Sequence, residues 1–258
     1  MSDDRQHALV DLIICAASLA WKDDGEVLAT GIGIVPRLAA SLAKLTVNPD
    51  LMMTDSEAWM VSEPVPIGPR GDYRVKRESH MGFARIFDNV WGGKRHAMVG
   101  PTQIDRYGQA NISMIGKDHH RPKAQMLGVR GFPGNSINHA NSFFVPNHGT
   151  KTFVDGEVDM VASVGYNPAR LARGWQLADI DIRLVITNLA VLDFGGPDHQ
   201  MRLVSVHQGV TPEQVQQATG FALHVPGALP TTPAPSAEQL ALLARVDPHG
   251  LRATVLGG

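Results

Sequence analysis

The amino-acid sequence predicts an α/β fold, in which helices pack in layers against a sheet. Helix-like and strand-like apolar segments alternate along the first half of the chain, and a hairpin pattern follows in the second half. The chain has 258 residues, of which 43% are hydrophobic, so it can bury a sizeable core. Together these observations predict an α/β layer architecture with an antiparallel portion late in the chain.

The first half of the chain is expected to alternate helices and strands. Apolar spacing predicts a helix over residues 6–21, and Pro36 suits the start of a second helix that continues to Leu45. Short apolar runs predict strands over residues 26–30, 51–54, 96–99 and 111–115. Residues 62–81 hold many prolines, glycines and charges, so we expect a long surface loop there.

The second half is expected to hold more strands and two short capped helices. Strands are predicted over residues 152–154, 160–164 and 182–187, and a hairpin from residues 189–194 and 201–206. Thr211 is expected to cap a helix over 212–219, and Ser236 a helix over 237–244. A proline-rich segment precedes Ser236. We therefore expect a domain over residues 1–225, and a linker with a C-terminal helix over 226–258 that packs on the domain or on a partner.

Composition excludes several classes of protein. The net charge is −2 and no basic block is present, which argues against a nucleic acid or a membrane surface as partner. Only 19% of residues are charged, so we expect a partner subunit to cover part of the surface. The single cysteine, Cys15, is expected to be a buried, inert thiol of a cytoplasmic protein. No apolar segment reaches the roughly 18 to 20 residues that span a bilayer.

The chemistry-bearing residues cluster at the end of one predicted strand. There the apolar run 51–53 ends in Thr54-Asp55-Ser56-Glu57-Ala58, followed by Trp59. Ligands of open α/β sheets collect at the carboxyl ends of strands. On a strand, the two carboxylates would share one face and Ser56 would point to the other, so either the carboxylates or the serine faces a ligand. The alternative is a polar strand end without a chemical role.

A glycine-rich segment is the second candidate site. Residues 128–135 read Gly-Val-Arg-Gly-Phe-Pro-Gly-Asn, with three glycines around Arg130. Main-chain N–H groups of such a loop can approach a ligand closely, and a guanidinium group presents a fixed fork to a carboxylate or phosphate. A purely structural loop is the alternative. Residues 99–108, which include Thr102 and Gln103, indicate a further loop beside a cleft.

Two other patterns are weaker. Gly31-Ile32-Gly33 before a helix is similar to a dinucleotide-binding turn but lacks the third glycine, so a plain tight turn is favoured over an NAD site. The histidines show no ligand spacing with a cysteine or carboxylate, so we expect no metal site. The six histidines that could suggest such a site are His119, His120, His139, His148, His199 and His207.

Several segments share their order and spacing with one known family. They are Gly31-Ile32-Gly33, Asn48-Pro49-Asp50, Gln103-Ile104-Asp105-Arg106-Tyr107-Gly108, residues 128–135, and Gly209-Val210-Thr211-Pro212-Glu213-Gln214-Val215 with Ala218-Thr219-Gly220-Phe221. In this order they resemble the β subunit of class I CoA-transferases, in particular the glutaconate CoA-transferase branch. The resemblance covers nearly the whole chain. It implies an open, mostly parallel sheet with flanking helices, the class I CoA-transferase-like fold.

One position departs from the transferase pattern. Transferases of this family carry a nucleophilic glutamate on the strand after the Pro-Asp pair, which forms an acyl-enzyme anhydride and then a CoA thioester. Counting from Asn48-Pro49-Asp50 places that glutamate at Ser56. Glu57 lies one residue further, which on a strand is the opposite face. The departure argues against an acyl-enzyme on this chain.

One branch is more similar still. Thr54-Asp55-Ser56-Glu57-Ala58, residues 128–135, and Phe194-Gly195-Gly196-Pro197-Asp198-His199 resemble the B subunit of the bacterial steroid (cholesterol) ring-cleaving CoA hydrolase. The resemblance implies a heteromer with an A (α) subunit, expected as α2β2, that acts on a cyclic keto-enoyl-CoA from the last steroid rings. Water adds and a carbon–carbon bond breaks in a retro-Claisen step, giving an open-chain dioxo diacyl-CoA. The main acid/base glutamate is expected on the A subunit.

The hydrolase hypothesis assigns catalytic and substrate-binding roles to residues of this chain. Arg130, Ser56 and Gly131 are the predicted catalytic residues. Residues expected to contact the substrate are Gly134, Asn135, Trp59, Thr102 and Gln103. No cofactor is expected, because coenzyme A is part of the substrate. No basic cluster is visible in the sequence, so coenzyme A is expected to bind mainly on the partner.

Three alternatives stay open. A true CoA-transferase would use Glu57 after a one-residue strand bulge. A non-catalytic subunit would only complete its partner's active site. An NAD-dependent dehydrogenase is the most distant alternative.

Overall fold

The computed structural model describes residues 3–55, 58–171 and 174–256. The chain forms two compact units, one of Met1–Val99 with Pro233–Gly258 and one of Gly100–Thr232. The domain boundary expected at residue 225 stays a prediction. Among the described residues, each helix is too short or too polar to span a membrane.

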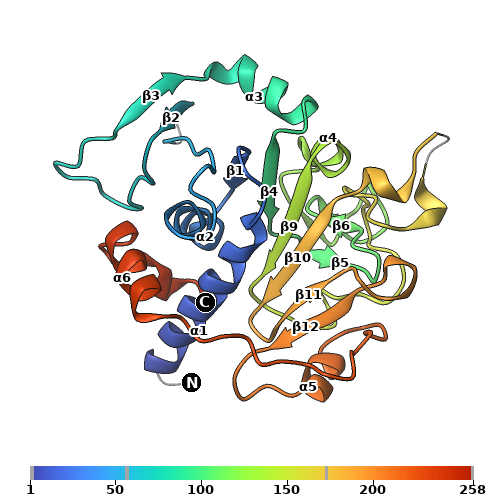
Figure 1. Cartoon of the computed structure of the whole chain (residues 1–258). Helices are drawn as coiled ribbons and strands as arrows, with labels where there is room; N and C mark the ends of the chain where they lie inside the picture. The colour runs from blue at the N-terminus through green and yellow to red at the C-terminus, as the bar shows by residue number, and fades with distance from the viewer. Residues whose placement is uncertain (1–2, 56–57, 172–173, 257–258) are drawn as a thin grey trace. The chain divides into compact units, whose positions relative to one another are not determined.

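Three helices pack together in the first unit: α1 (Asp3–Ser18), α2 (Ile34–Leu45) and α6 (Ala237–Val246) (Figure 1). The 3-10 turn Leu19–Trp21 extends α1, and a second one, Leu251–Thr254, follows α6. The buried α1 positions Val10, Ile13, Ile14 and Ala17 follow helical spacing, which explains why the sequence predicted this helix. Helix α2 begins two residues before the predicted start. Pro36 is therefore its third residue, where a missing N–H costs no intrahelical bond.

The strands of the first unit form a parallel pair and an antiparallel pair. Strand β1 (Leu28–Gly31) pairs in parallel with β4 (Arg95–Val99), with Leu28 opposite Arg95. Strands β2 (Trp59–Val61) and β3 (Arg77–His80) are antiparallel. Between β3 and β4 lies helix α3 (Gly82–Trp91), which the sequence did not predict. The expectation of a loop throughout 62–81 is wrong at β3, because β2 provides a partner for those polar residues.

The predicted strand over residues 51–54 is wrong as a regular strand. Met52 makes only an isolated parallel bridge to Leu28, and Thr54 an isolated antiparallel bridge to Met60. The chain pairs with β1 for one residue and then turns back to pair with its own continuation. The apolar run was read correctly as buried, since Leu51 and Met53 are almost fully buried.

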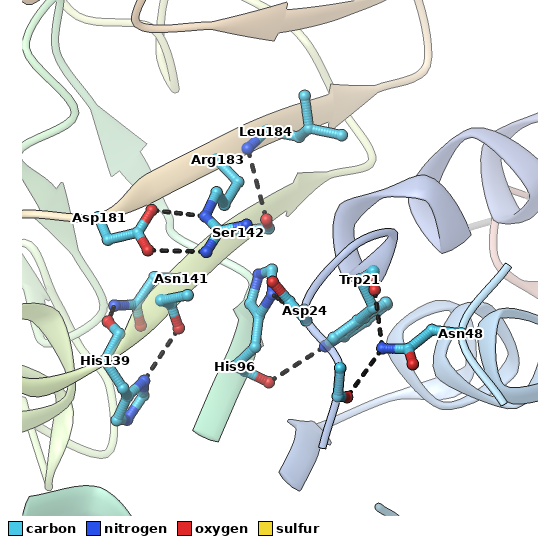
Figure 2. A network of polar contacts seen from close by, with 12 residues as sticks. Trp21, Asp24, Asn48, His96, His139, Asn141, Ser142, Asp181, Arg183 and Leu184 are labelled. Atoms are coloured by element: carbon cyan, nitrogen blue, oxygen red, sulfur yellow. Dashed lines mark hydrogen bonds and ion pairs between the residues drawn. The ribbon is translucent and has the colours of Figure 1, made fainter. Parts of the chain in front are cut away.

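Buried polar bonds connect the helices of the first unit to β4 (Figure 2). The side-chain amide of Asn48 donates to the carbonyl oxygens of Trp21 at 3.0 Å and Gly25 at 3.1 Å. The indole N–H of Trp21 donates to the carbonyl of His96 at 3.4 Å, and the His96 Nδ1 lies 2.6 Å from an Asp24 carboxylate oxygen. These bonds fix the ends of α1 and α2 to the parallel pair.

Four strands of the second unit pair as neighbours in the order β9 (Ala140–Val145), β10 (Ile182–Thr187), β11 (Ala190–Asp193), β12 (Arg202–Val206). Strand β9 is parallel to β10, and β10–β11–β12 form antiparallel neighbours, so three of these four strands run the same way. The predicted hairpin of β11 and β12 is confirmed. The fold prediction is confirmed as well: the strands are mostly parallel, with helices beside them and an antiparallel portion late in the chain.

Shorter elements complete the second unit. Two small antiparallel pairs are β5 (Gln103–Ile104) with β6 (Ala110–Asn111) and β7 (Met114–Ile115) with β8 (Ala124–Gln125). The helices are α4 (Phe132–Asn138), α5 (Pro212–Gln217) and the 3-10 turns Pro168–Arg170, Leu177–Asp179 and Pro197–His199. Thr211 caps α5, and in the first unit Ser236 caps α6; each donates and accepts in a capping box, as predicted.

Three strand predictions in this unit need correction. The strand expected over 111–115 is broken into β6 and β7, because the Asn111 side chain accepts from the N–H of Ser113 and donates to the carbonyl of Met114. Residues 152–154 and 160–164 form only isolated bridges, Ile104 with Phe153 and Ala110 with Ser163. Their partners β5 and β6 are too short to support a longer ladder.

Candidate functional site

Asp55 is the centre of the candidate site in the first unit. Its side chain is fully buried, and its Oδ2 accepts from the Arg77 Nε at 2.9 Å. Its Oδ1 accepts from the main-chain N–H of Trp59 at 3.3 Å, and its own N–H donates to the Trp59 carbonyl at 3.0 Å. The carboxylate that the sequence offered as a possible ligand group is therefore used inside the protein, where it holds the chain reversal together.

Three arginines converge on this point from three different segments. The Arg37 Nη1, in the first turn of α2, donates to the Thr54 carbonyl at 2.8 Å. The Arg70 Nη2 donates to the Asp55 carbonyl at 3.0 Å, and Arg77 of β3 pairs with the Asp55 carboxylate. Burial lowers the pKa of Arg37, and the positive charge of Arg70 lowers it further. Arg70 and Arg77 belong to one segment, residues 70–77, that holds four basic residues, whereas Arg37 lies far from it in sequence. Their convergence with Arg37 could be found only from the tertiary structure.

Aromatic rings lie beside the arginines. The Trp59 ring, on β2, is 4.9 Å from the His80 ring on β3, and the Arg77 guanidinium carbon is 5.4 Å from the Trp59 centroid. Trp59 and His80 are opposite each other in the register of these two strands. Trp59 is thus half-buried beside the ring of His80 and the guanidinium group of Arg77. Its predicted contact with the substrate stays a prediction.

Ser56 and Glu57 lie outside the described residues. The predicted role of Ser56, and the alternative role of Glu57 as a transferase nucleophile, both stay predictions. The described neighbours on either side are Asp55, which is buried, and Ala58, whose φ of 64° lies in the left-handed region.

The glycine-rich segment of the second unit is partly helical, which corrects the expectation of a loop throughout. Arg130 is exposed and has a φ of 49°, and Gly131 is the N-cap of α4. The segment is held in place because Phe132 is buried and meets Phe143 of β9 edge to face, with ring centroids 6.2 Å apart. Arg130, Gly131, Gly134 and Asn135 are therefore brought together on one turn.

Hydrogen bonding decides which of these groups can serve a ligand. The N–H of Asn135 donates to the Gly131 carbonyl at 3.0 Å and is occupied. Within the described ranges, the N–H groups of Gly131 and Gly134 have no main-chain or side-chain acceptor. The binding of a ligand by these two N–H groups, which the sequence predicted for this segment, stays a prediction.

Thr102 and Gln103 are used inside the second unit. The buried Gln103 amide donates to Asp159 at 3.1 Å and accepts from Asn111 at 2.7 Å and from the Asp159 N–H at 3.0 Å. The Thr102 hydroxyl lies 3.0 Å from the Met126 sulfur. Their predicted contact with substrate stays a prediction, and Gln103 has little capacity left for it.

Asp105 follows β5 and carries a perturbed carboxyl group. Burial raises its pKa to about 7, although its Oδ1 accepts from the N–H groups of Tyr107 at 2.9 Å and Gln109 at 3.0 Å. Since both bonds close a local turn, Asp105 has a structural role in which its carboxyl group orders residues 105–109.

The buried histidines make structural bonds. His148 lies between the hydroxyls of Thr187 at 3.1 Å and Thr219 at 2.9 Å, and burial lowers its pKa to about 3. His207 lies between the Thr232 hydroxyl and the Thr187 carbonyl, each at 2.9 Å. No group of three His, Cys, Asp or Glu side chains suited to a metal is present among residues 3–55, 58–171 and 174–256. Cys15 is buried, and burial raises its thiol pKa to about 12.

Comparison with known proteins identifies the family. No family model matches the chain. The chain is 41% identical over 248 residues to the cholesterol ring-cleaving hydrolase IpdB subunit of Mycobacterium tuberculosis, covering 93% of this chain and 95% of that protein. The chain belongs to the IpdB family. The IpdB subunit of Rhodococcus jostii is 39% identical, with 92% of each chain covered.

Solved structures agree with this assignment. The crystal structure of Rhodococcus jostii IpdAB matches with a TM-score of 0.86 at 36% identity, covering 96% of this chain and 98% of that one. Glutaconate CoA-transferase of Acidaminococcus fermentans matches with a TM-score of 0.78 at 26% identity, covering 93% of this chain and 95% of that one. The resemblance inferred from the sequence is therefore confirmed, both for the CoA-transferase-like fold and for the IpdB branch within it.

Proposed function

We propose that this IpdB-family chain is the B subunit of a heteromeric hydrolase that opens the last ring of a cyclic keto-enoyl-CoA in cholesterol or steroid catabolism. The observation that carries the proposal is the 41% identity, over 93% of the chain, to a subunit named as a cholesterol ring-cleaving hydrolase. A ring ketone in the β position to a thioester is suited to hydrolytic cleavage. Water adds to the ketone, the bond to the α-carbon breaks, and the electron pair enters the thioester enolate, which is then protonated.

The partner is an A subunit, in an assembly that we propose to be α2β2. The two-subunit structure of Rhodococcus jostii IpdAB supports this assignment. We further propose that the complex is cytoplasmic, which the single, buried cysteine supports. The chemistry needs no resident cofactor, because the carbonyl groups of the substrate accept the electron pair and coenzyme A enters with the substrate.

In this proposal the segment at residues 130–135 stabilises negative charge. The free N–H groups of Gly131 and Gly134 would donate to the oxyanion, and the exposed Arg130 guanidinium would pair with it or with a carboxylate. Left-handed backbone at Arg130 costs free energy for a residue with a side chain. Such strain is typical of functional sites, and it supports a role for this residue beyond closing a turn.

Ser56 is proposed to occupy the position of the transferase nucleophile. A serine there leaves room for water and offers a hydroxyl group, whereas an acyl-enzyme through a carboxylate would require glutamate in the same register. The main acid/base carboxylate is then supplied by the A subunit.

The test is turnover of a cyclic keto-enoyl-CoA by the co-purified pair. Arg130→Ala is expected to lower kcat/KM about a hundredfold or more, the usual effect of losing one donor to an oxyanion. Arg121→Ala is the matched control, since Arg121 is an exposed arginine of the same unit whose side chain makes no bond within the described residues. Equal kcat/KM values for the two variants would remove Arg130 from the site.

A CoA-transferase is the second candidate, because the chain is 29% identical, over 78% of its length, to the B chain of glutaconate CoA-transferase from Acidaminococcus fermentans. It predicts ping-pong kinetics with a second acyl acceptor such as acetate, and an enzyme–CoA thioester that can be trapped at Glu57. A purely structural role for this chain predicts instead that substitutions in residues 128–135 reduce assembly without changing turnover per assembled complex.

A further inference from the structure

Two of the three arginines at the chain reversal carry positive charge that no described carboxylate neutralises by contact. Arg37 and Arg70 each donate to a main-chain carbonyl, Thr54 and Asp55 respectively. The carboxylate of Asp55 is instead bonded to Arg77 and to the Trp59 N–H. Within the described residues, neither Arg37 nor Arg70 forms an ion pair.

The position of Arg37 is unfavourable for a cation. It lies in the first turn of α2, where the partial positive charge of the helix N-terminus repels it. It is also half-buried, with Arg70 as a neighbouring like charge. The charge of Asp55 favours the cation, but that carboxylate is already bonded to Arg77. One carboxylate beside three guanidinium groups leaves net positive charge, which a further anion would offset.

The geometry leaves donors for that anion. A guanidinium group has five N–H donors, and the described bonds use one each on Arg37 and Arg70. The two groups bond adjacent carbonyls, so both are anchored at residues 54–55. Both side chains are only partly buried. Met52 pairs in parallel with Leu28 at the start of β1, so residues 54–55 lie toward the carboxyl end of that strand. Ligands of open α/β sheets usually bind at this end.

We propose that Arg37 and Arg70 form an oxyanion-binding site for the substrate, which holds either a carboxylate of the acyl group or a phosphate of coenzyme A. This inference rests on the proposed function for the identity of the substrate. Arg77 has a different part: it pairs with Asp55 and lies against Trp59, so it positions the chain reversal. The site revises the expectation that this chain has no basic cluster for the anionic parts of an acyl-CoA.

Arg70→Gln in the co-purified pair tests the site. Arg74→Gln is the matched control. Arg74 lies between β2 and β3, as Arg70 does; it is exposed, and its side chain makes no bond within the described residues. Arg70→Lys keeps the positive charge but loses the planar fork, so it reports on binding even where Arg70→Gln lowers stability. Calorimetric titrations with free coenzyme A and with glutarate measure binding without turnover. Steady-state KM values are compared for a cyclic keto thioester that bears a free carboxylate and for its methyl ester.

Loss of a charge-assisted pair is expected to weaken binding roughly ten- to a hundredfold for Arg70→Gln, and less than about twofold for Arg74→Gln. A carboxylate occupant shows as weaker glutarate binding and a higher KM for the free acid alone. A phosphate occupant shows as weaker coenzyme A binding and a higher KM for both thioesters. If Arg70→Gln and Arg74→Gln match in both titrations and both KM values, the site is refuted. If the wild-type pair turns over neither thioester, the proposed function fails, while the two titrations still decide the site.

Discussion

The buried carboxyl group of Asp105 should make stability depend on pH in an unusual direction. Its side chain is 2% exposed, and burial raises its pKa from 3.8 to about 7. The folded state therefore binds a proton that the unfolded state has lost between about pH 4 and pH 7. This group's contribution to stability is fully present below pH 3.8 and falls as pH rises, by about 1.4 kcal/mol per pH unit and about 4 kcal/mol in all.

Asp105→Asn removes the titrating group and keeps an oxygen that can accept from Tyr107 and Gln109. We expect the unfolding free energy of the variant, relative to wild type, to rise by up to about 4 kcal/mol between pH 4 and pH 8. Urea unfolding of the co-purified pair at a fixed concentration, followed by circular dichroism, measures this difference. Asp118→Asn is the control, because Asp118 is exposed and accepts from the His120 N–H at 2.9 Å in a similar turn. A difference that does not vary with pH for Asp105→Asn would refute the reasoning from burial.

Two further predictions concern buried polar groups. Burial lowers the pKa of His148 to about 3, so the stability that its neutral form contributes is present above pH 6.5 and is lost as pH falls. We expect the unfolding free energy to fall by about 2 kcal/mol between pH 6.5 and 5 because of this group. Urea unfolding curves of His148→Gln should lack this decrease. Asn48→Ala removes two buried bonds, from the Asn48 amide to the carbonyls of Trp21 and Gly25, which keep main-chain bonds from Asp24 and Val27. The loss is expected to lower the unfolding free energy by about 2 kcal/mol in urea melts. Asn89→Ala removes an exposed bond to the Arg85 carbonyl and a weak contact with the Met81 sulfur, so it should cost less than about 1 kcal/mol. Equal costs for the two variants would contradict the argument.

Elements with strong local signals were predictable. Thr211 and Ser236 cap helices because their hydroxyls bond main-chain N–H groups three residues ahead, an interaction contained within four residues of sequence. The hairpin of β11 and β12 likewise depends on nearby turn residues. Helix α3 was missed although a signal was present. Phe83, Ile86, Phe87 and Val90 follow helical spacing and would have indicated it.

Elements that depend on distant partners were not predictable. Helix α4 contains Pro, Gly and two Asn residues, a composition that favours a loop, and it is held by Phe132 against Phe143 of β9. β3 is a strand only because β2 lies beside it. Residues 51–54 were expected to be a strand from their apolar run, but the return of the chain at Trp59 limits their pairing to isolated bridges.

By itself, the sequence determined the fold class and the family, because the order and spacing of motifs along a chain can be compared without knowledge of its contacts. Only the tertiary structure decided what the residues around Asp55 do. It showed that the carboxylate is buried and paired, and that Arg37, Arg70 and Arg77 meet beside it. These arginines are separated by up to 40 residues and lie on a helix, a connecting segment and a strand. Charges that far apart in sequence have no common periodicity, so their convergence is a property of the packed chain alone.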